Sequence, residues 1–334
     1  MFLGAGASAP LGKPTMAQFV EKLKKDITEG EQATLLSLLI KVRGSDLEAL
    51  LGELDTLIEL DYLESMGSRV LSTYTSISRS VAKRLRTTVE HAIIREYRHV
   101  EPAKAVSLYQ PLIELLFSYL DPQSQCLPIF STNYDPAIEI FCEESFSNYA
   151  ITDGFEFDPA SRQYFWNESV FDHYQPVSGK KNIVLFKMHG SVDWLFVNSR
   201  QKIRRGQAMY DYLDSDAYDN ILIYPATRKI ATDNPYYTAY EYFQRCCENA
   251  SLNLTIGYSF RDYDALTRLR GAASSNEKLQ VGVLSPDANE LTEKVPIPQS
   301  RVTGLPYFFG DSKTSADSLG KIAELLDGAL KNQK

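Results

Sequence analysis

Met1-Phe-Leu-Gly4-Ala-Gly6-Ala-Ser8 opens the sequence and decides the fold class. Apolar residues followed at once by small ones are typical of a strand that ends in a tight turn before a helix. Such glycines let backbone N–H groups approach a phosphate, and the pattern fits a dinucleotide fingerprint with alanine in the third place. A strand-to-helix turn without a ligand explains the same glycines, so both interpretations stay open. The apolar run is short for a buried strand of about five residues, which indicates a truncated strand or residues before Met1.

Further short apolar runs, bounded by turn residues, predict the other strands of a sheet. With the first run, the predicted strands are Met1–Leu3, Leu127–Ser131, Asn182–Lys187, Ile221–Tyr224, Leu252–Ile256 and Leu279–Leu284. Most of these runs do not alternate between apolar and polar residues. We therefore expect both faces of the sheet to be covered, as in a parallel sheet.

Helical patterns lie between these runs. Thr15-Met-Ala-Gln18 and Ser45-Asp-Leu-Glu48 are capping boxes, and apolar residues at helical spacing follow each. Pro111 suits the first position of another helix, which ends near Asp121. The remaining predicted helices are Ile77–Tyr97, Tyr240–Asn249 and Leu319–Leu330.

This order of elements predicts an α/β protein with a Rossmann-like, open and mostly parallel sheet. A helical insert of about residues 30–120 follows the first strand. Residues 141–181 place aromatic side chains among Gly, Asp, Pro and Asn, and we expect a loop or hairpin excursion there. The length allows one large domain or two small ones, and no linker or repeat decides between them. We interpret residues 1–334 as one domain. For the leucines of the second helix, core packing is favoured over an oligomer interface; they are Leu47, Leu50, Leu54 and Leu57.

Composition excludes several classes of protein. The 334 residues include 35 Lys+Arg and 43 Asp+Glu, a formal charge of −8, so no overall basic field attracts nucleic acid. Solvated loop charge is favoured over a nucleic-acid patch for the local basic residues, which are Lys202, Arg204, Arg205, Arg228 and Lys229. The sequence has neither a signal segment nor a run of about 18 apolar residues. We expect a cytoplasmic protein without a membrane partner.

The four cysteines indicate neither a disulfide framework nor a metal site. They are Cys126, Cys142, Cys246 and Cys247, and no two are separated by the two to four residues typical of zinc ligands. No metal is therefore expected.

Two more polar clusters follow predicted strands. Ser131-Thr-Asn133-Tyr-Asp135-Pro136 comes after one, and Lys187-Met-His189-Gly190-Ser191 comes after another. Asn133 and Asp135 could simply form a turn and cap a helix, and His189 could be a packing residue. In an open parallel sheet, however, ligands bind beyond the carboxyl ends of the strands. Three polar clusters at such ends favour a ligand site.

In this order the three motifs, with Gly257-Tyr-Ser259 after them, resemble the sirtuin family. The likeness is greatest to the sirtuin-like domains of bacterial anti-phage defence proteins, which destroy NAD rather than deacylate proteins. The resemblance implies that Asn133 holds the nicotinamide ribose, that Asp135 holds the carboxamide and that His189 is the base. The implied NAD-binding residues are Gly4, Ala5, Gly6 and Ser8 at the phosphates, Gly257 and Ser259 along the adenosine side, and Ser285 or Asp287 at the adenine ribose, with Thr132 as a further NAD-binding residue.

The resemblance also implies an activity. An NAD glycohydrolase would release nicotinamide and ADP-ribose, with water as nucleophile, as a gated effector of abortive infection. A homo-oligomer, a partner ATPase or helicase, or a nuclease-like partner would control it. Deacylases of the family carry a zinc module of paired cysteines, which this sequence lacks, and Gly12-Lys-Pro14-Thr-Met16 stands where the family has an arginine-bearing element. An NAD-dependent protein deacylase, a non-enzymatic NAD or ADP-ribose sensor and, more distantly, a dehydrogenase remain alternatives.

Overall fold

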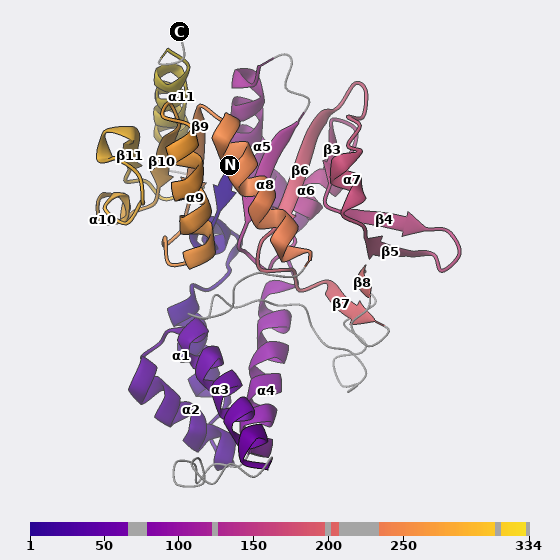
Figure 1. The fold of residues 1–334 in the computed structure, drawn as a ribbon, viewed down its shortest axis with the longest axis vertical. Helices are drawn as coiled ribbons and strands as arrows, with labels where there is room; N and C mark the ends of the chain where they lie inside the picture. The colour runs from indigo at the N-terminus through magenta and orange to yellow at the C-terminus, as the bar shows by residue number, and fades with distance from the viewer. Residues whose placement is uncertain (66–78, 122–125, 198–201, 207–233, 311–314, 332–334) are drawn as a thin grey trace. The chain divides into compact units, whose positions relative to one another are not determined.

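A sheet of seven parallel strands runs through the part of the chain that carries the three motifs (Figure 1). Its strands are β1 (Phe2–Leu3), β2 (Leu127–Ser131), β3 (Tyr149–Thr152), β6 (Lys181–Lys187), β9 (Leu252–Ile256), β10 (Gln280–Leu284) and β11 (Val302–Leu305). They are ordered β11-β10-β9-β1-β2-β6-β3, so the strand order reverses at β1. The predicted Rossmann-like parallel sheet is confirmed.

The computed structural model describes residues 1–65, 79–121, 126–197, 202–206, 234–310 and 315–331. Five predicted strands are present as β1, β2, β6, β9 and β10. The predicted strand Ile221–Tyr224 lies outside the described residues. The short strands β3 and β11 were not predicted, because neither has a long apolar run. No helix in the described ranges is long and apolar enough to cross a membrane.

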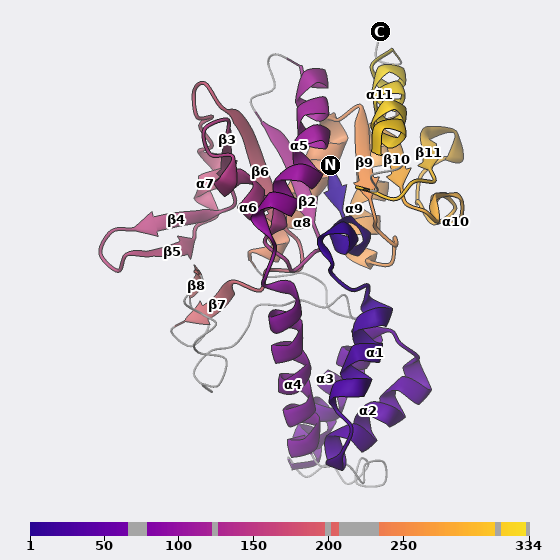
Figure 2. The same ribbon diagram turned by 180° about the vertical axis from the view of Figure 1, so that it is seen from behind.

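Helices cover both faces of the sheet, as Figures 1 and 2 show from opposite sides. One face packs against α5 (Pro102–Tyr119), α6 (Ala137–Glu144) and α11 (Ser315–Lys331). The other packs against α7 (Ser169–Asp172), α8 (Tyr236–Asn249), α9 (Tyr263–Ser275) and α10 (Ala288–Thr292). Neighbouring residues of a strand point to opposite faces, so Ile129 joins the first layer and Phe130 the second.

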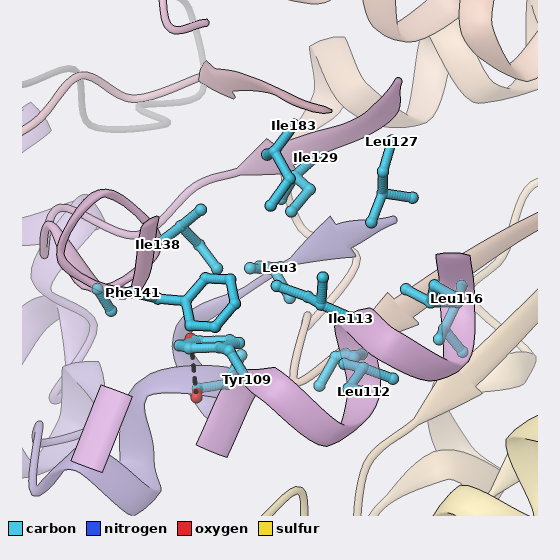
Figure 3. Packing of buried hydrophobic residues seen from close by; sticks show 14 of the residues in the cluster. Leu3, Tyr109, Leu112, Ile113, Leu116, Leu127, Ile129, Ile138, Phe141 and Ile183 are labelled. Carbon is cyan, nitrogen blue, oxygen red and sulfur yellow. Dashed lines mark hydrogen bonds between the residues drawn. The ribbon is translucent and has the colours of Figure 1, made fainter. Parts of the chain in front are cut away.

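The first layer is held by close packing of apolar side chains. Leu3 and Ile129 from neighbouring strands meet Ile113 of α5 and Phe141 of α6 (Figure 3), and each is 1% exposed or less. Burying one such side chain contributes about 1.5–3 kcal/mol, which explains why a strand as short as β1 holds the centre of the sheet.

The prediction that Pro111 begins a helix is wrong. Pro111 lies inside α5, which begins at Pro102. A proline in a helix interior removes one backbone hydrogen bond, at a cost of about 3 kcal/mol. Here Tyr109, Leu112 and Ile113, on either side of it, are all 1% exposed or less, and their burial offsets that cost.

A second sheet, antiparallel and four-stranded, lies in the range 155–205. Its strands are β4 (Phe155–Asp158), β5 (Gln163–Trp166), β7 (Trp194–Val197) and β8 (Lys202–Arg205), in the order β4-β5-β8-β7. β4 and β5 form a hairpin inside the predicted excursion of 141–181, while β3 from that range joins the parallel sheet. The prediction of loop charge is wrong for Lys202, Arg204 and Arg205, which are residues of β8. Arg205 pairs with Asp153. Arg228 and Lys229 lie outside the described residues.

The chain divides into two compact units, and Pro14–Glu96 forms the second of them. Its helices are α1 (Met16–Asp26), α2 (Gly30–Arg43), α3 (Leu47–Ser65) and α4 (Arg79–Tyr97), which ends one residue beyond the unit. The predicted insert of 30–120 also contains α5, which belongs to the first unit with the parallel sheet. Of the four leucines named in the prediction, three lie buried in α3 and support core packing: Leu47, Leu50 and Leu54, each 2% exposed or less. The fourth, Leu57, is half-buried.

The two capping boxes differ in outcome. Thr15 and Gln18 form the predicted box at the start of α1. The box predicted at Ser45 is wrong, because Asp46 caps α3 instead, accepting a hydrogen bond from the Ala49 N–H over 3.1 Å. An aspartate is as good an N-cap as a serine, and spacing alone does not choose between neighbours.

Candidate functional site

Ser8 joins two of the sequence motifs. It lies in a 3-10 helix, η1 (Ala5–Leu11), which follows β1 after Gly4 and occupies the segment predicted as a tight turn. The Ser8 hydroxyl donates to Asp135 Oδ2 over 2.6 Å and accepts from Asn133 Nδ2 over 2.9 Å. All three side chains are 7% exposed or less. The first and second motifs therefore form one buried polar network.

The glycines of the first motif are required by packing between two turns. A Cβ atom on Gly4 would lie 2.5 Å from Cα of Tyr258, and one on Gly6 would lie 2.8 Å from Cα of Gly257. Gly6 N–H also donates to the Gly257 carbonyl over 2.8 Å. Only glycine lets η1 and the turn after β9 approach so closely. The turn interpretation of the motif thus holds, whatever else these residues bind.

Asp135 makes the turn contact that the sequence offered as one of two alternatives. Its Oδ1 accepts from the Ala137 N–H over 3.2 Å, at the start of α6, while its Oδ2 accepts the hydrogen bond from the Ser8 hydroxyl. Lys187, at the end of β6, donates from Nζ to the Asp135 carbonyl over 2.5 Å. The loop after β2 is therefore held from both sides.

The His189 loop is bound to the Asn133 loop by the backbone. β2 and β6 are in register, with Ser131 opposite Lys187. Beyond the strands, Met188 N–H donates to the Ser131 carbonyl over 2.8 Å, and Val192 N–H donates to the Tyr134 carbonyl over 3.0 Å. The two motifs thus run side by side at the carboxyl end of the sheet.

His189 has a buried carboxylate partner that sequence reasoning missed. Its Nε2 lies 2.9 Å from Asp262 Oδ2, and the two side chains are 6% and 5% exposed. Tyr240 donates its hydroxyl to the same oxygen over 2.5 Å. Burial raises the pKa of Asp262, but hydrogen bonds from His189 and Tyr240 and the charge of His189 outweigh it, so the pKa is lowered. The signal in the sequence was an aspartate two residues after Phe260, at the start of a helical pattern.

Charged groups are buried beneath the same loops. Lys187 Nζ lies 3.7 Å from Glu139 Oε1, with side chains 2% and 9% exposed. Burial raises the pKa of Glu139 to about 7, although Lys187 opposes the shift, and burial also raises the pKa of Asp193. Glu139 Oε2 and Asp193 Oδ1 are buried without a hydrogen-bond partner. The sequence did not predict this cluster, because its members come from α6, β6 and the loop before β7.

The remaining predicted residues lie further from this network. Thr132 is 9% exposed and donates its hydroxyl to the Leu3 carbonyl over 3.3 Å. Ser259 and Asp287 are exposed, in the turns after β9 and β10. Within the described part of the chain, no group of three or more His, Cys, Asp or Glu side chains is arranged to hold a metal.

A model of the SIR2-like domain family matches residues 128–295, about half of the chain. The chain belongs to the SIR2-like domain family. The matched segment of this SIR2-like protein includes Asn133, His189 and Asp262, whereas the Ser8 loop precedes it.

Solved Sir2 structures are also similar to this SIR2-like chain. A Sir2 homologue mutant in complex with 2'-O-acetyl ADP-ribose is 13% identical, with 97% of this chain and 91% of that one covered and a TM-score of 0.46. A Sir2 homologue–NAD complex is 13% identical, with coverages of 97% and 89% and a TM-score of 0.45. No curated protein matches the sequence.

Proposed function

We propose that the protein is an NAD glycohydrolase that cleaves NAD⁺ with water into nicotinamide and ADP-ribose. The observation that carries the proposal is the buried bridge in which Ser8 joins Asn133 and Asp135. It lies at the carboxyl end of the sheet, next to β1, where the strand order reverses and where open α/β sheets bind their ligands. We propose NAD as the substrate because the chain belongs to the SIR2-like family and because its motifs resemble those of sirtuins.

The polar groups of the bridge fit such a substrate. The Asn133 amide has two N–H donors, and Ser8 accepts from it, so one donor remains for a ribose hydroxyl or a water. Each Asp135 oxygen has capacity for a second hydrogen bond beside the one it accepts, which suits the carboxamide of nicotinamide. We assign the binding of the rest of NAD to the residues that the resemblance implies: Gly4, Ala5, Gly6, Thr132, Gly257, Ser259 and Asp287.

The reaction needs little covalent chemistry from the protein. The bond between the nicotinamide nitrogen and ribose C1′ breaks, and its electron pair leaves with nicotinamide. A water oxygen bonds to C1′, and His189 accepts the proton that the water loses. Asn133 and Asp135 hold the sugar and the leaving group in the geometry in which this bond breaks. Deacylases of the resembling family have a zinc module of closely spaced cysteine pairs. The sequence has no such pairs, which favours hydrolysis over deacylation.

The biological role that we propose is a gated effector of anti-phage defence in the cytoplasm, which depletes NAD in an infected cell. This part follows from the resemblance. Uncontrolled loss of NAD is toxic, so a homo-oligomer, or a partner ATPase, helicase or nuclease-like protein, would control the activity.

The direct test measures nicotinamide release from NAD by the wild-type chain, with and without proteins that co-purify with it. Asn133→Ala and His189→Ala should each lower the rate at least 100-fold. His173→Ala, which changes an exposed histidine, is the matched control and should keep the wild-type rate. Unchanged turnover in both site variants would contradict the assignment.

Two other outcomes identify the alternatives. Release that requires an acylated peptide would indicate a protein deacylase. Tight NAD or ADP-ribose binding, without turnover under any activating condition, would indicate a sensor.

A further inference from the structure

We propose that Asp262 is a positioning residue for His189: its carboxylate accepts a hydrogen bond from the Nε2–H group and leaves Nδ1 as the nitrogen that takes up a proton in the reaction. The inference rests on the proposed function for the role of that proton. The contact itself is a property of the fold and can be tested separately.

The geometry goes beyond what a helix cap requires. Asp262 Oδ1 accepts from the N–H groups of Asp264 and Ala265, over 3.0 and 3.2 Å, and so caps α9. That cap uses one oxygen. The other, Oδ2, is not used by the cap and lies 2.9 Å from His189 Nε2. An asparagine, serine or threonine would cap α9 as well, so the cap alone does not explain an aspartate.

Asp262 is held in place by groups from separate elements. Tyr240 of α8 donates to Oδ2 over 2.5 Å, while the first turn of α9 fixes Oδ1. Asp262 and Tyr240 are each 4% exposed as whole residues. A buried side chain with both oxygens bound has one orientation, and that orientation fixes the imidazole of His189.

The ionised state of Asp262 determines the direction of the hydrogen bond. Burial raises the pKa of this carboxyl, but its hydrogen bonds and the charge of His189 have the larger, opposite effect. The pKa therefore lies below its ordinary value, and the carboxyl is ionised at neutral pH. An ionised carboxylate only accepts hydrogen bonds. His189 Nε2 must therefore carry a proton, and the neutral ring keeps its lone pair on Nδ1.

Asp262→Asn is the most informative change, because it keeps the size and the cap but replaces the Oδ2 acceptor, which contacts both His189 and Tyr240, by an NH₂ donor. The Tyr240 hydroxyl can rotate to accept, whereas His189 has to change tautomer. The N–H groups of Asp264 and Ala265 need an oxygen, so the amide oxygen stays on α9 and the NH₂ group turns toward His189. His189 Nε2 must then accept, and the ring proton moves to Nδ1. The nitrogen that should act as base is blocked.

We expect Asp262→Asn to lower kcat for nicotinamide release by about 10²- to 10⁴-fold, as for other histidines held in the wrong tautomer. KM for NAD and the melting temperature should stay near wild type. Tyr240→Phe is the matched control: it also removes a hydrogen bond from Oδ2, but it leaves the tautomer unchanged, so kcat should fall less than about 10-fold. Equal kcat in Asp262→Asn and the wild type would overturn the inference.

A readout without turnover keeps the two proposals separate. Two-bond ¹H–¹⁵N spectra of histidine-labelled protein report which imidazole nitrogen carries the proton, and the His189 signal is identified by its loss in His189→Ala. At a pH where the ring is neutral, we expect protonated Nε2 in the wild type and protonated Nδ1 in Asp262→Asn. The same tautomer in both would overturn the positioning role. A wild type that never cleaves NAD but shows this change would reject the glycohydrolase and keep the Asp262–His189 contact.

Discussion

Lys187 Nζ donates to the main-chain oxygen of Asp135 over 2.5 Å, and both residues are 3% exposed. The ammonium group also lies 3.7 Å from Glu139 Oε1. One buried cation thus connects the end of β6 with the loop after β2 and with α6. The Lys187 ammonium group therefore helps to position Asp135 without having to contact a ligand itself.

Replacing this cation should strongly destabilise the fold. Lys187→Met removes the partner of buried Glu139, and breaking one side of a buried pair costs about 3–5 kcal/mol. Urea unfolding measures this loss. The double variant Lys187→Met/Glu139→Leu should recover a large part of it, because no uncompensated charge of that pair remains. Lys181→Met, at an exposed site, is the control. A double variant as unstable as the single one would contradict the pairing.

Glu139 makes stability depend on pH. Burial raises its pKa to about 7 in the folded chain, from an unfolded value of 4.5, so the folded state holds the proton more tightly. The unfolding free energy should therefore fall as the pH rises from about 4.5 to 7, by up to about 3 kcal/mol from this group. Asp193, whose pKa is also raised, acts in the same direction.

Glu139→Gln separates this contribution from the rest of the chain. The variant has no carboxyl to titrate at that position, so the decline in unfolding free energy between pH 4.5 and 7 should become shallower. Glu156→Gln, at an exposed site of β4, should leave the slope unchanged. Identical slopes in wild type and Glu139→Gln would argue against a buried titrating carboxyl there.

Gly257 should be far less tolerant of alanine than a helix glycine. It has a φ of +60°, and an added Cβ would lie 2.4 Å from the Ala7 nitrogen. We expect Gly257→Ala to cost about 3 kcal/mol or more, from strain and from separation of the two turns. Gly320→Ala, in α11 with nothing within 4 Å, should stabilise by about 0.5–1 kcal/mol. Thermal unfolding of both variants checks the contrast; a similar melting temperature for the two would refute it.

Ser8→Ala should lower both activity and stability. It removes the group that joins Asn133 to Asp135 and leaves two buried polar side chains with one partner fewer. The expected loss of stability is about 1–3 kcal/mol. If the proposed function holds, nicotinamide release should fall at least 10-fold. Ser274→Ala, on an exposed turn of α9, is the control for both measurements. Full activity in Ser8→Ala would show that the bridge does not hold the reacting groups.

Much of the sheet was predictable from the sequence. Residues 127–130 and 183–186 are apolar throughout, and such a run is typical of a strand that is buried on both faces of a parallel sheet. β3 escaped prediction because Tyr149–Thr152 is short and pairs only through β6. Pro111 was misjudged because local propensity favours a helix start, whereas the burial of Tyr109 and Leu112 decides in favour of an interior position.

The sequence by itself determined which residues stand at the ends of strands. Ser8, Asn133 and His189 follow short apolar runs, and in the structure each of them follows a strand. The place where a strand ends depends mainly on the local sequence. Only the tertiary structure decided which of these groups touch and what holds them. Asp262 and His189 are in contact although they are 73 positions apart in the sequence, and Lys187 and Asp135 are in contact although they are 52 positions apart. Such contacts depend on which strands are neighbours in the sheet, and nothing in the local sequence encodes that neighbourhood.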